Sequence, residues 1–586
     1  MVKINIDGKE ITSELGKSVI EAAMENGIDI PHFCWHPELS VSGNCRMCLV
    51  EIGLPKLGPD RKPIIAADGT PEVSFMPKLQ IACATQISDG MHVRTKTQPV
   101  LQAREAVMEF FLINHPLDCP ICDEAGQCKL QDYAFNHSNG TSRFEENKNP
   151  KDKRVEWGPR VLYDGERCIS CSRCIRYAKE TAGQDVLSFV NRGDKVTIKV
   201  ADGQKWDNPY SMNVIDICPV GALTSRDFRF KARVWEMSFN DSICNGCSRG
   251  CNIRIGVRNN EILRIDPKNN PKVNKTNICD FGRLELYPKA MQDRILDPLL
   301  RTSGELKTTD FQTAIAAVAN GLKHFSPKEI MIVSSASATV ETNFALSRLA
   351  KNVLKTSNIE FVRYIDKGFA DDLLRREEMM PNANGAEATG AGQGIPIEKL
   401  ISKLKDDNFK AVIVVEDDFR GNGEMFEVLG KTPLVVAIVS NYSKLTDIAH
   451  IVLPAAVTAE SEGTFVNFKN RVQHFAPALI TNENRANMGL KMSRLDKFGA
   501  PNDRWTQNTA NHAMQSWRII SQIASALGDK WNYNSSKDVF ADVVKSIPSF
   551  AGLDYRILDK HFGIVLGSSE PNAIPFVYDS HRMKPY

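Results

Sequence analysis

The chain has 586 residues, of which 42% are hydrophobic and 25% are charged, and its formal net charge is +2. This composition is ordinary for a soluble protein of several domains, and the small net charge gives no sign of a nucleic-acid partner. No apolar run approaches the roughly 20 residues that a membrane helix needs. The start, MVKINIDGKEITSE, lacks the character of a signal or transit peptide. We therefore expect a cytoplasmic protein without direct membrane insertion.

All 15 cysteines lie between Cys34 and Cys279, in four groups, and the rest of the chain contains none. In a reducing cytosol, clustered cysteines are more often metal ligands than disulfides, and an odd number argues against a purely disulfide framework. The pattern predicts a row of iron–sulfur centres followed by a cysteine-free globular half. A chain with several one-electron centres is most simply an electron conductor.

The first group follows a short stretch with ferredoxin-like elements. Residues 2–12 alternate like a strand pair around Asp7-Gly8, a common hairpin turn, and residues 18–26 predict a helix closed by Gly27. A small ferredoxin-like domain holding [2Fe–2S] is favoured over zinc, because zinc sites usually come as two short-spaced pairs. The cysteines have the spacing C-x10-C-x2-C-x34-C: Cys34, Cys45, Cys48 and Cys83. His32 and His36, which flank Cys34, are expected to shape this loop or tune the cluster by hydrogen bonds.

The second group, in HPLDCPICDEAGQC, has only three cysteines: Cys119, Cys122 and Cys128. A four-iron cube needs four protein ligands, so this set lacks one. His115, Asp118 and Asp123 are the candidates nearby. We favour His115, because imidazole ligates iron in Rieske centres, although a histidine beside a proline is by itself more often structural.

The third group predicts half of a two-cluster ferredoxin. Its cysteines are Cys168, Cys171, Cys174 and Cys218, the last followed by Pro219. Two-cluster ferredoxins contain two runs of the form C-x2-C-x2-C-x3-C-P. The fourth cysteine of each run ligates the cluster that is bound by the first three cysteines of the other run. The positions that a second cluster would use hold other residues: Ala178, Asn208, Ser211 and Val214. One complete [4Fe–4S] set survives, and the second cluster has been lost.

The fourth group has the spacing C-x2-C-x3-C-x27-C: Cys244, Cys247, Cys251 and Cys279. The segment NIRIGVRNNEILRIDP predicts two strands around Asn259-Asn260. A small β domain with another [4Fe–4S] is favoured. A zinc ribbon is the rival interpretation, but it would need a fourth ligand close to Cys279.

The second half alternates strand-like and helical segments. The runs EIMIV, IEFVRY, AVIVV, PLVVAIV and HIVLP alternate with stretches such as ETNFALSRLAKNVL. This pattern predicts parallel sheet flanked by helices. The Gly-rich segment 385–394 matches no nucleotide-binding fingerprint, and we expect a flexible surface loop there. The Pro-rich, aromatic tail 571–586 is expected to pack along a neighbouring subunit.

In this order, the motifs resemble the largest peripheral-arm subunit of NADH–quinone oxidoreductase, which is called G in bacteria and is the 75-kDa iron–sulfur subunit of respiratory complex I. FCWHPELSVSGNCRMCLVE with IACATQ is similar to that family's binuclear-cluster loop. HPLDCPICDEAGQCKLQD resembles its histidine-ligated cube, with His115 at the family's histidine position. CISCSRC with DICPVGAL resembles its next cube, and the fourth set resembles an additional cube kept in some bacterial members.

The resemblance implies an electron-transfer role without a complete active site on this chain. Electrons would enter at the binuclear cluster, pass to the Cys168-type cube and then to the His115-type cube, while the fourth cube would lie off the main path. The implied cofactors are one [2Fe–2S] and three [4Fe–4S] clusters. The implied partners are a flavin and NADH-binding subunit, a [2Fe–2S] subunit of the 24-kDa type, and ferredoxin-like and quinone-site subunits. The implied location is the cytoplasmic face of the bacterial inner membrane.

The second half resembles a molybdopterin-oxidoreductase domain that has lost its chemistry. HIVLPAAVTAESEGTFVNFKNRVQ is similar to the pterin-side signature, but Lys469-Asn470 stands where relatives usually carry Glu-Gly. With no cysteine after Cys279, we expect no molybdopterin.

Three other functions remain open at this point. They are the same wiring in an NAD-linked hydrogenase or formate dehydrogenase, an active molybdenum enzyme, and a zinc-stabilised scaffold. The expected organisation is multidomain α+β and α/β. Its parts are a β-grasp domain at 1–95, a helical segment at 96–150, a ferredoxin-like domain at 151–236, a small β domain at 237–295 and an α/β domain at 296–586.

Overall fold

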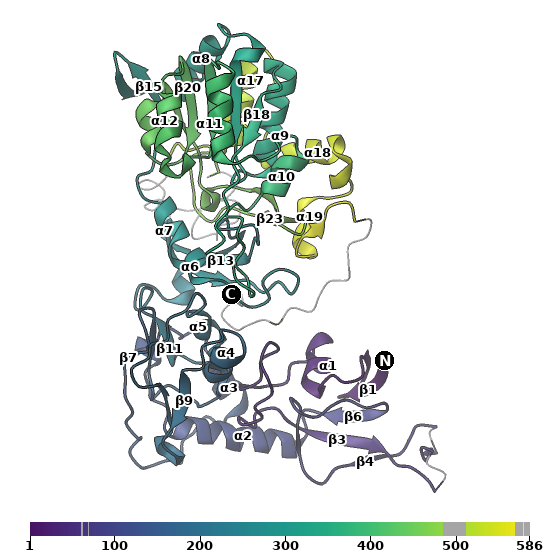
Figure 1. Cartoon of the computed structure of the whole chain (residues 1–586). Helices are drawn as coiled ribbons and strands as arrows, with labels where there is room; N and C mark the ends of the chain where they lie inside the picture. Colours follow the sequence, from purple (N-terminus) through teal and green to yellow (C-terminus); the bar gives the residue numbers. More distant parts are fainter. Residues whose placement is uncertain (60–61, 68, 485–510, 569–577, 579–586) are drawn as a thin grey trace, which may run out of the picture. The chain divides into compact units, whose positions relative to one another are not determined.

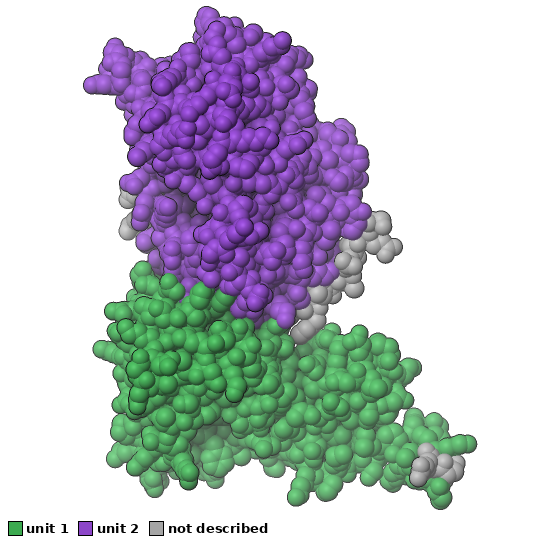
Figure 2. All heavy atoms as spheres, in the orientation of Figure 1, with its two compact units in different colours: residues 1–236, 578–586 green, residues 237–577 purple. Residues whose placement is uncertain are grey.

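The structure is a computed structural model that describes residues 1–59, 62–67, 69–484, 511–568 and Tyr578 (Figure 1). Two compact units divide the chain: residues 1–236 with 578–586, and residues 237–577. Figure 2 shows the two units in different colours. Among the described residues, no helix combines the length and the apolar character needed to span a bilayer.

The first domain is a six-stranded mixed sheet covered by one helix. Its main path runs β2-β1-β6-β3-β4, with β5 paired to β3, and β1 pairs with β6 in parallel while the other pairs are antiparallel. The predicted hairpin turn is present, since Asp7 and Gly8 both have positive φ angles. Ser18 caps the helix in a capping box with Glu21. The elements are β1 (Val2–Ile6), β2 (Lys9–Ser13), α1 (Val19–Glu25), β3 (Leu49–Pro55), β4 (Val73–Phe75), β5 (Gln80–Ile81) and β6 (Met91–Arg94).

The rest of the first unit consists of one long helix and several short elements that hold loops in place. The 16-residue helix α2 leads from the sheet into the loop of the second cysteine group. A three-stranded sheet, β11-β8-β7, and the hairpin β9–β10 frame the third group. The elements are α2 (Gln98–Ile113), η1 (Cys119–Ile121), α3 (Lys129–His137), β7 (Val155–Glu156), β8 (Val161–Tyr163), α4 (Arg173–Glu180), β9 (Leu187–Val190), η2 (Gly193–Lys195), β10 (Thr197–Val200), α5 (Asn213–Ile217), β11 (Leu223–Ser225) and η3 (Val234–Glu236).

The second unit begins with a small antiparallel sheet of order β12-β13-β14. The two strands predicted around Asn259-Asn260 are confirmed as β13 and β14, and both turn residues have positive φ angles. The short helices α6 and α7 follow. The bounds are β12 (Ser238–Ile243), β13 (Asn252–Arg258), β14 (Glu261–Pro267), α6 (Asp280–Leu284) and α7 (Leu286–Ala290).

A seven-stranded sheet of order β16-β15-β21-β20-β19-β17-β18 forms the centre of the second unit. Strands β17 to β21 pair in parallel, which confirms the predicted sheet, whereas β15 and β16 are antiparallel at one edge. All five residues of β19, the run AVIVV, are buried. Ile413 and Val415 lie in one hydrophobic core, and Val412 and Val414 lie in a second one. Because successive side chains of a strand point to opposite faces, such a run must be covered on both faces.

The strands of this sheet are β15 (Leu299–Thr302), β16 (Glu305–Thr308), β17 (Ile330–Ser334), β18 (Ile359–Phe361), β19 (Ala411–Val415), β20 (Leu434–Val439) and β21 (Ile451–Pro454). The other described helices of this unit (Figure 1) are α8 (Phe311–Leu322), α9 (Val340–Arg348) with its π-helical extension η5 (Leu349–Leu354), α10 (Ala383–Ala388), α11 (Ile397–Asp406), α12 (Gly423–Leu429), α13 (Lys444–Ile448), α17 (Ser516–Ala526), α18 (Ser536–Ser546) and α19 (Tyr555–Lys560). Short 3-10 turns are η4 (Pro327–Glu329), η6 (Phe419–Gly421), η7 (Thr458–Glu460) and η8 (Pro548–Phe550). A separate sheet joins β22 (Gly463–Val466), β23 (Arg471–Phe475) and β24 (Ile564–Val565).

One sequence-based expectation differs in part from the structure, and a second is largely untested. The prediction of a surface loop at residues 385–394 is wrong for its first part, because α10 continues to Ala388 and both Gly385 and Ala386 are buried. Helix packing overrides the local glycine signal there. The predicted tail contact lies outside the described residues except for Tyr578, which packs within the first unit of this same chain.

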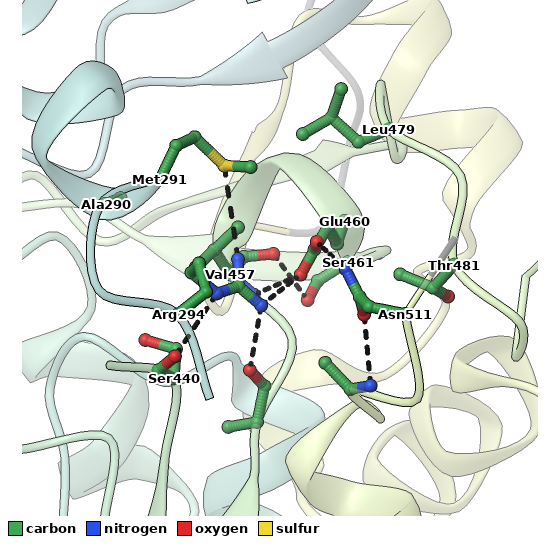
Figure 3. A network of polar contacts seen from close by, with 12 residues as sticks. Ala290, Met291, Arg294, Ser440, Val457, Glu460, Ser461, Leu479, Thr481 and Asn511 are labelled. Carbon is green, nitrogen blue, oxygen red and sulfur yellow. Dashed lines mark hydrogen bonds and ion pairs between the residues drawn. The ribbon is translucent and has the colours of Figure 1, made fainter. Parts of the chain in front are cut away.

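A buried ion pair anchors the segment that resembles the pterin-side signature. Arg294 and Glu460 approach within 2.8 Å, and both side chains are almost fully buried. Figure 3 shows that the Glu460 carboxylate also accepts hydrogen bonds from Asn511 and from the amide of Val457, at 2.9 and 3.0 Å. Arg294 also donates to the carbonyl of Ser440. The carboxylate of Glu460 in this segment is therefore paired with a cation inside the protein.

Candidate metal centres

The first cysteine group converges in the loop between α1 and β3, joined there by Cys83 from beyond β5. All four residues are buried. Hydrogen bonds from the thiols of Cys45 and Cys83 lower the pKa of Cys34, and a hydrogen bond from Cys83 lowers the pKa of Cys48. The sulfur atoms are therefore within hydrogen-bond reach of one another. Arg46 and Gly43 have positive φ angles, which turn the loop tightly enough to bring its cysteines together.

The second group and His115 line one cavity. His115 follows the C-terminus of α2, Cys119 begins η1, Cys122 follows η1, and Cys128 is the N-cap of α3. Burial and the nearby cations Lys148 and Arg167 lower the pKa of His115 to about 4. Its imidazole is therefore neutral at pH 7 and has a lone pair available for a metal.

The carboxylate of Asp118, a rival candidate ligand, is engaged elsewhere. It accepts hydrogen bonds from Lys153 and from Arg167, each at 2.9 Å. The third candidate, Asp123, accepts a hydrogen bond from the amide of Phe230 at 3.1 Å.

Gly221 closes the second cavity from a different part of the chain. A Cβ atom at this position would lie 2.1 Å from the sulfur of Cys122, a distance that no real contact allows. Only glycine lets the backbone come so near this thiol. Sequence reasoning missed this residue. Its signal was its place in DICPVGAL, directly after Cys218-Pro219-Val220.

The third group lies on two packed helices. Cys174 is in α4 and Cys218 caps the C-terminus of α5, while Cys168 and Cys171 lie in the loop before α4. Ser170 and Ser172, between and after these two cysteines, have left-handed backbone angles. Burial raises the pKa of Cys174, and the neighbouring thiols Cys171, Cys168 and Cys218 raise it further. The four thiols therefore share one buried site.

Side chains fill the region where a two-cluster ferredoxin would carry its second cluster. Ala178, Ser211 and Val214 are fully buried. The indole of Trp206, also fully buried, donates to the carbonyl of Ser211 at 2.8 Å. Packed protein thus occupies these positions.

The third group contacts both the first and the second group. Arg176 donates to the carbonyl oxygens of Cys34 and Cys171, at 2.5 and 3.4 Å. Next to the second group, the amide of Lys129 donates to the carbonyl of Pro219 at 3.2 Å. These hydrogen bonds join the loops of three cysteine groups within one unit.

The fourth group lines a small cavity in the second unit. All four cysteines are buried, and the other walls are mainly apolar, including Ile253, Phe281 and Phe369. A Cβ at Gly282 would lie 2.8 Å from the sulfur of Cys244. The glycine therefore leaves room beside the thiols that a side chain would take.

The segment that resembles the pterin-side signature, residues 450–473, holds the loop of this fourth group in place and is called the signature-like segment below. Gln473 donates to the carbonyl of Gly250 at 3.1 Å, and Asn467 donates to the carbonyl of Arg249 at 3.2 Å. The amide of Phe468 donates to the carbonyl of Ser248 at 2.9 Å. Residues of this segment therefore act as hydrogen-bond donors to the cysteine loop.

The chemistry of these donor sets fits iron–sulfur clusters. Burial raises the pKa of Cys122, Cys171 and Cys279 to about 11 in each case, so these thiols keep their protons at neutral pH without a metal. A metal binds the thiolate and displaces the proton. Within the described residues, no three His, Cys, Asp or Glu side chains converge on a single-ion position. Each protein ligand of a cluster binds a different iron or shares one with a single other ligand, so the ligands of a cluster do not need to converge on one ion position.

Family models match in the order of these sites. A 2Fe-2S iron-sulfur cluster binding domain matches residues 1–98, the NADH-ubiquinone oxidoreductase-G iron-sulfur binding region matches 104–143, and the ferredoxin-like domain of NADH-quinone oxidoreductase subunit 3 matches 158–224. The molybdopterin oxidoreductase Fe4S4 domain matches 237–284, and the molybdopterin oxidoreductase family matches 377–485. The chain is therefore an iron–sulfur protein that joins ferredoxin-type domains to a molybdopterin-oxidoreductase-type domain, and its predicted fold class is confirmed.

Curated relatives narrow this class. The chain is 40% identical over 374 residues to NADH-quinone oxidoreductase subunit 3 of Thermus thermophilus, covering 62% of this chain and 47% of the relative. It is 39% identical over 324 residues to the NADH-ubiquinone oxidoreductase 75 kDa subunit of Reclinomonas americana, covering 55% and 43%. The resemblance predicted from the motifs is confirmed: the chain is a homologue of the 75-kDa iron–sulfur subunit. It spans about half the length of the curated relatives it matches.

The solved structures that match include the NAD+-reducing [NiFe]-hydrogenase in the H2-reduced state. It is 26% identical with a TM-score of 0.32, covering 40% of this chain and 91% of that one. At this TM-score the likeness says nothing about the function of the chain.

Proposed function

We propose that this chain is the iron–sulfur electron-transfer subunit of a proton-translocating NADH–quinone oxidoreductase. It relays electrons from the flavin subunit towards quinone through one [2Fe–2S] and two [4Fe–4S] clusters, and it carries a further [4Fe–4S] off this path. The observation that supports the proposal is that the cysteines fall into four sets, buried in the first and fourth and partly buried in the second and third, in the order of the matching family models.

The chain's own residues hold and tune the clusters. Fifteen thiolates and one imidazole are the proposed ligands, with His115 completing the second set. The clusters supply one-electron redox chemistry when bound. The engagement of Asp118 with Lys153 and Arg167 supports His115 as the fourth ligand. The proposed ligand sets are Cys34, Cys45, Cys48 and Cys83; His115, Cys119, Cys122 and Cys128; Cys168, Cys171, Cys174 and Cys218; and Cys244, Cys247, Cys251 and Cys279.

The contacts between ligand loops support an order for electron transfer. The third group shares hydrogen bonds with the loops of the first and the second group. This arrangement supports transfer from the first group to the third and then to the second, which is the order that the resemblance implies. The fourth group belongs to the other unit, and its apolar cavity supports a structural role.

The second half is proposed to be a scaffold without molybdopterin. Gln473 and Asn467 of the signature-like segment bind the fourth cysteine loop, and Glu460 is paired with Arg294. These side chains make contacts within the chain. This supports the proposal that the segment holds the cysteine loop in place and does not bind a pterin.

Exposed apolar side chains near the second group support docking of the next electron carrier. Leu117, which lines the cavity of His115, is 88% exposed, and Phe135 on α3 is 90% exposed. Phe110 on α2 and Ile121 in η1 are also exposed. Such side chains favour a protein interface. We propose that a ferredoxin-like subunit covers them and that the flavin and NADH-binding subunit, the [2Fe–2S] subunit and the quinone-site subunit complete a peripheral assembly on the cytoplasmic face of the bacterial inner membrane.

Metal analysis of the anaerobically purified full chain, combined with EPR during stepwise reduction, tests the proposal. One [2Fe–2S] and three [4Fe–4S] clusters require 2 + 12, or about 14, iron atoms per chain. That value without molybdenum supports the proposal. About 10 iron with one zinc would make the fourth group a zinc site and leave the relay intact. Stoichiometric molybdenum would contradict the proposal for the second half.

A further inference from the structure

Tyr578, close to the C-terminal end of the sequence, is part of the hydrophobic core of the first domain. Its side chain is only 3% exposed, although it is hundreds of residues away from its neighbours along the chain. The ring packs edge-on against Trp35 and His36, with centroids 5.5 and 5.2 Å apart. The ammonium group of Lys129 lies 5.6 Å from the centre of the same ring. These contacts fix the position of the tyrosine ring.

The hydroxyl of Tyr578 meets three polar side chains. It lies 3.0 Å from Nε2 of His32, 3.5 Å from Nζ of Lys129 and 3.4 Å from Nη2 of Arg173. Lys129 and Arg173 are 1% and 3% exposed. Two cations are thus buried around a single hydroxyl.

Each of these three side chains belongs to the ligand loop of a different predicted cluster. His32 lies two residues before Cys34, Lys129 directly follows Cys128, and Arg173 directly precedes Cys174. One hydroxyl group therefore joins the loops of the first, second and third cysteine groups.

The hydrogen-bond directions in this cluster follow from its geometry. Nδ1 of His32 lies 2.8 Å from the carbonyl of Ile30, so that nitrogen carries the hydrogen. Nε2 lies 3.1 Å from the ammonium of Lys129, which is only a donor, so Nε2 is the acceptor. The oxygen of Tyr578 accepts from Arg173 and Lys129, and its hydroxyl hydrogen shares the single lone pair of Nε2 with Lys129. Arg173 is held further by the carbonyls of Trp35 and Ile217, at 2.6 and 2.9 Å.

We infer that Tyr578 is a positioning residue for electron transfer: its hydroxyl holds Lys129 and Arg173 in fixed places beside the ligand loops of three clusters. The inference rests on the proposed function, because it presupposes those clusters. Iron–sulfur clusters with four thiolates are anionic, and reduction adds a further negative charge. A fixed cation nearby stabilises the reduced form, and burial strengthens this interaction because little water screens it. The position of the two cations therefore helps to set the reduction potentials.

An anaerobic EPR redox titration of the full chain tests the inference with the variant Tyr578→Phe. Phenylalanine keeps the ring packing and removes only the hydroxyl. We expect shifted midpoint potentials for the clusters of the first three groups and an unchanged potential for the fourth, which serves as a control in the same sample. Tyr442→Phe, at an exposed tyrosine of the other unit, is the matched control and should shift none. Unchanged potentials in Tyr578→Phe would overturn the inference.

A second variant separates the role of the hydroxyl from that of the ring. Lys129→Met removes one of the two cations and is expected to lower the potential of the second-group cluster, because its reduced form loses a stabilising charge. Tyr578→Phe should then cause a smaller shift when it is added to Lys129→Met than when it is made alone. Equal shifts in both backgrounds would contradict an effect through Lys129. If the wild-type chain showed none of the three EPR signals, the proposed function itself would fail, whereas wild-type signals with an unaffected Tyr578→Phe would remove only this inference.

Discussion

His115 is the residue that completes the proposed ligand set of the second metal centre. Its pKa of about 4, which follows from burial and from the cations Lys148 and Arg167, keeps the ring neutral at pH 7. A neutral imidazole brings no charge to a cluster, whereas a thiolate brings a negative one. Histidine ligation therefore favours the reduced form and raises the potential, as it does in Rieske centres.

Replacement of His115 tests this role directly. We expect His115→Cys to keep the second cluster and to lower its midpoint potential, because an anionic thiolate replaces the neutral ring. His115→Ala should lose the EPR signal of that centre alone. Asp118→Asn is the matched control, since it alters a neighbouring candidate without removing the proposed ligand. If His115→Ala kept a complete cluster with an unchanged spectrum, His115 would not be its ligand.

At the scale of elements, β23 and α19 are joined by a charged histidine. Burial by itself would lower the pKa of His474, but hydrogen bonding to Asp559, at 2.9 Å, and the nearby Glu462 raise it to about 9. The ring also stacks on Tyr555 with centroids 4.0 Å apart. The folded protein therefore binds a proton that the unfolded chain releases near pH 6.5.

This pairing predicts a pH-dependent contribution to stability. Because the pKa of His474 is higher in the folded protein than in the unfolded chain, its ion pairs stabilise the folded protein fully below pH 6.5. This contribution to the free energy of unfolding decreases as the pH rises and is lost above about pH 9. We expect His474→Gln to lower the free energy of unfolding by about 1–3 kcal/mol at pH 6. The range allows for screening by water, because the carboxylate of Asp559 is exposed. The cost should be absent at pH 10. Calorimetry of the full chain at pH 6, 8 and 10 measures it, and a cost independent of pH would show that packing and not charge is responsible.

The ion pair between Arg294 and Glu460 links the segment before β15 to the turn η7. Both side chains are almost fully buried, so removing one partner leaves a charge without compensation in a poorly solvated site. We expect Glu460→Gln to destabilise the second unit by about 3–5 kcal/mol, measured as a fall in its unfolding midpoint.

An exposed ion pair in the same unit serves as a control for that change. Glu424 pairs with Lys405 at 2.7 Å, and both are largely solvated. Glu424→Gln should leave the midpoint unchanged, because exposed pairs contribute little. Similar effects of the two substitutions would contradict a special role of burial at Glu460.

At the scale of the whole molecule, the third and fourth cysteine groups are proposed to have different roles. In the assembled oxidoreductase, Cys218→Ala should abolish NADH–quinone activity, because it removes a ligand on the proposed path. Cys251→Ala should mainly reduce assembly or stability, because its cavity belongs to the other unit. Activity is measured together with the amount of assembled complex. A stable, fully assembled Cys251→Ala complex without electron flow would contradict a structural role for the fourth cluster.

Much of the fold could be predicted because its signals are local. Alternation around Asp7-Gly8 and Asn259-Asn260 predicted two hairpins that the structure contains, and continuous apolar runs predicted the parallel strands. Local signals failed at residues 385–388, where glycine and alanine predicted a loop but packing against the buried neighbours of Ala386 produced a helix. The weak local preference of glycine against a helix is overridden here, because forming the helix allows its apolar face to be buried.

The sequence by itself determined the four cysteine groups, the candidate histidine and the resemblance to the 75-kDa iron–sulfur subunit, because metal ligands leave a readable spacing along the chain. Only the tertiary structure decided which groups touch, why residue 221 must be glycine, and that Tyr578 meets Lys129 and Arg173. These features join residues that are far apart along the chain. No local pattern encodes such contacts, because they arise only when folding brings the separate loops into one buried site.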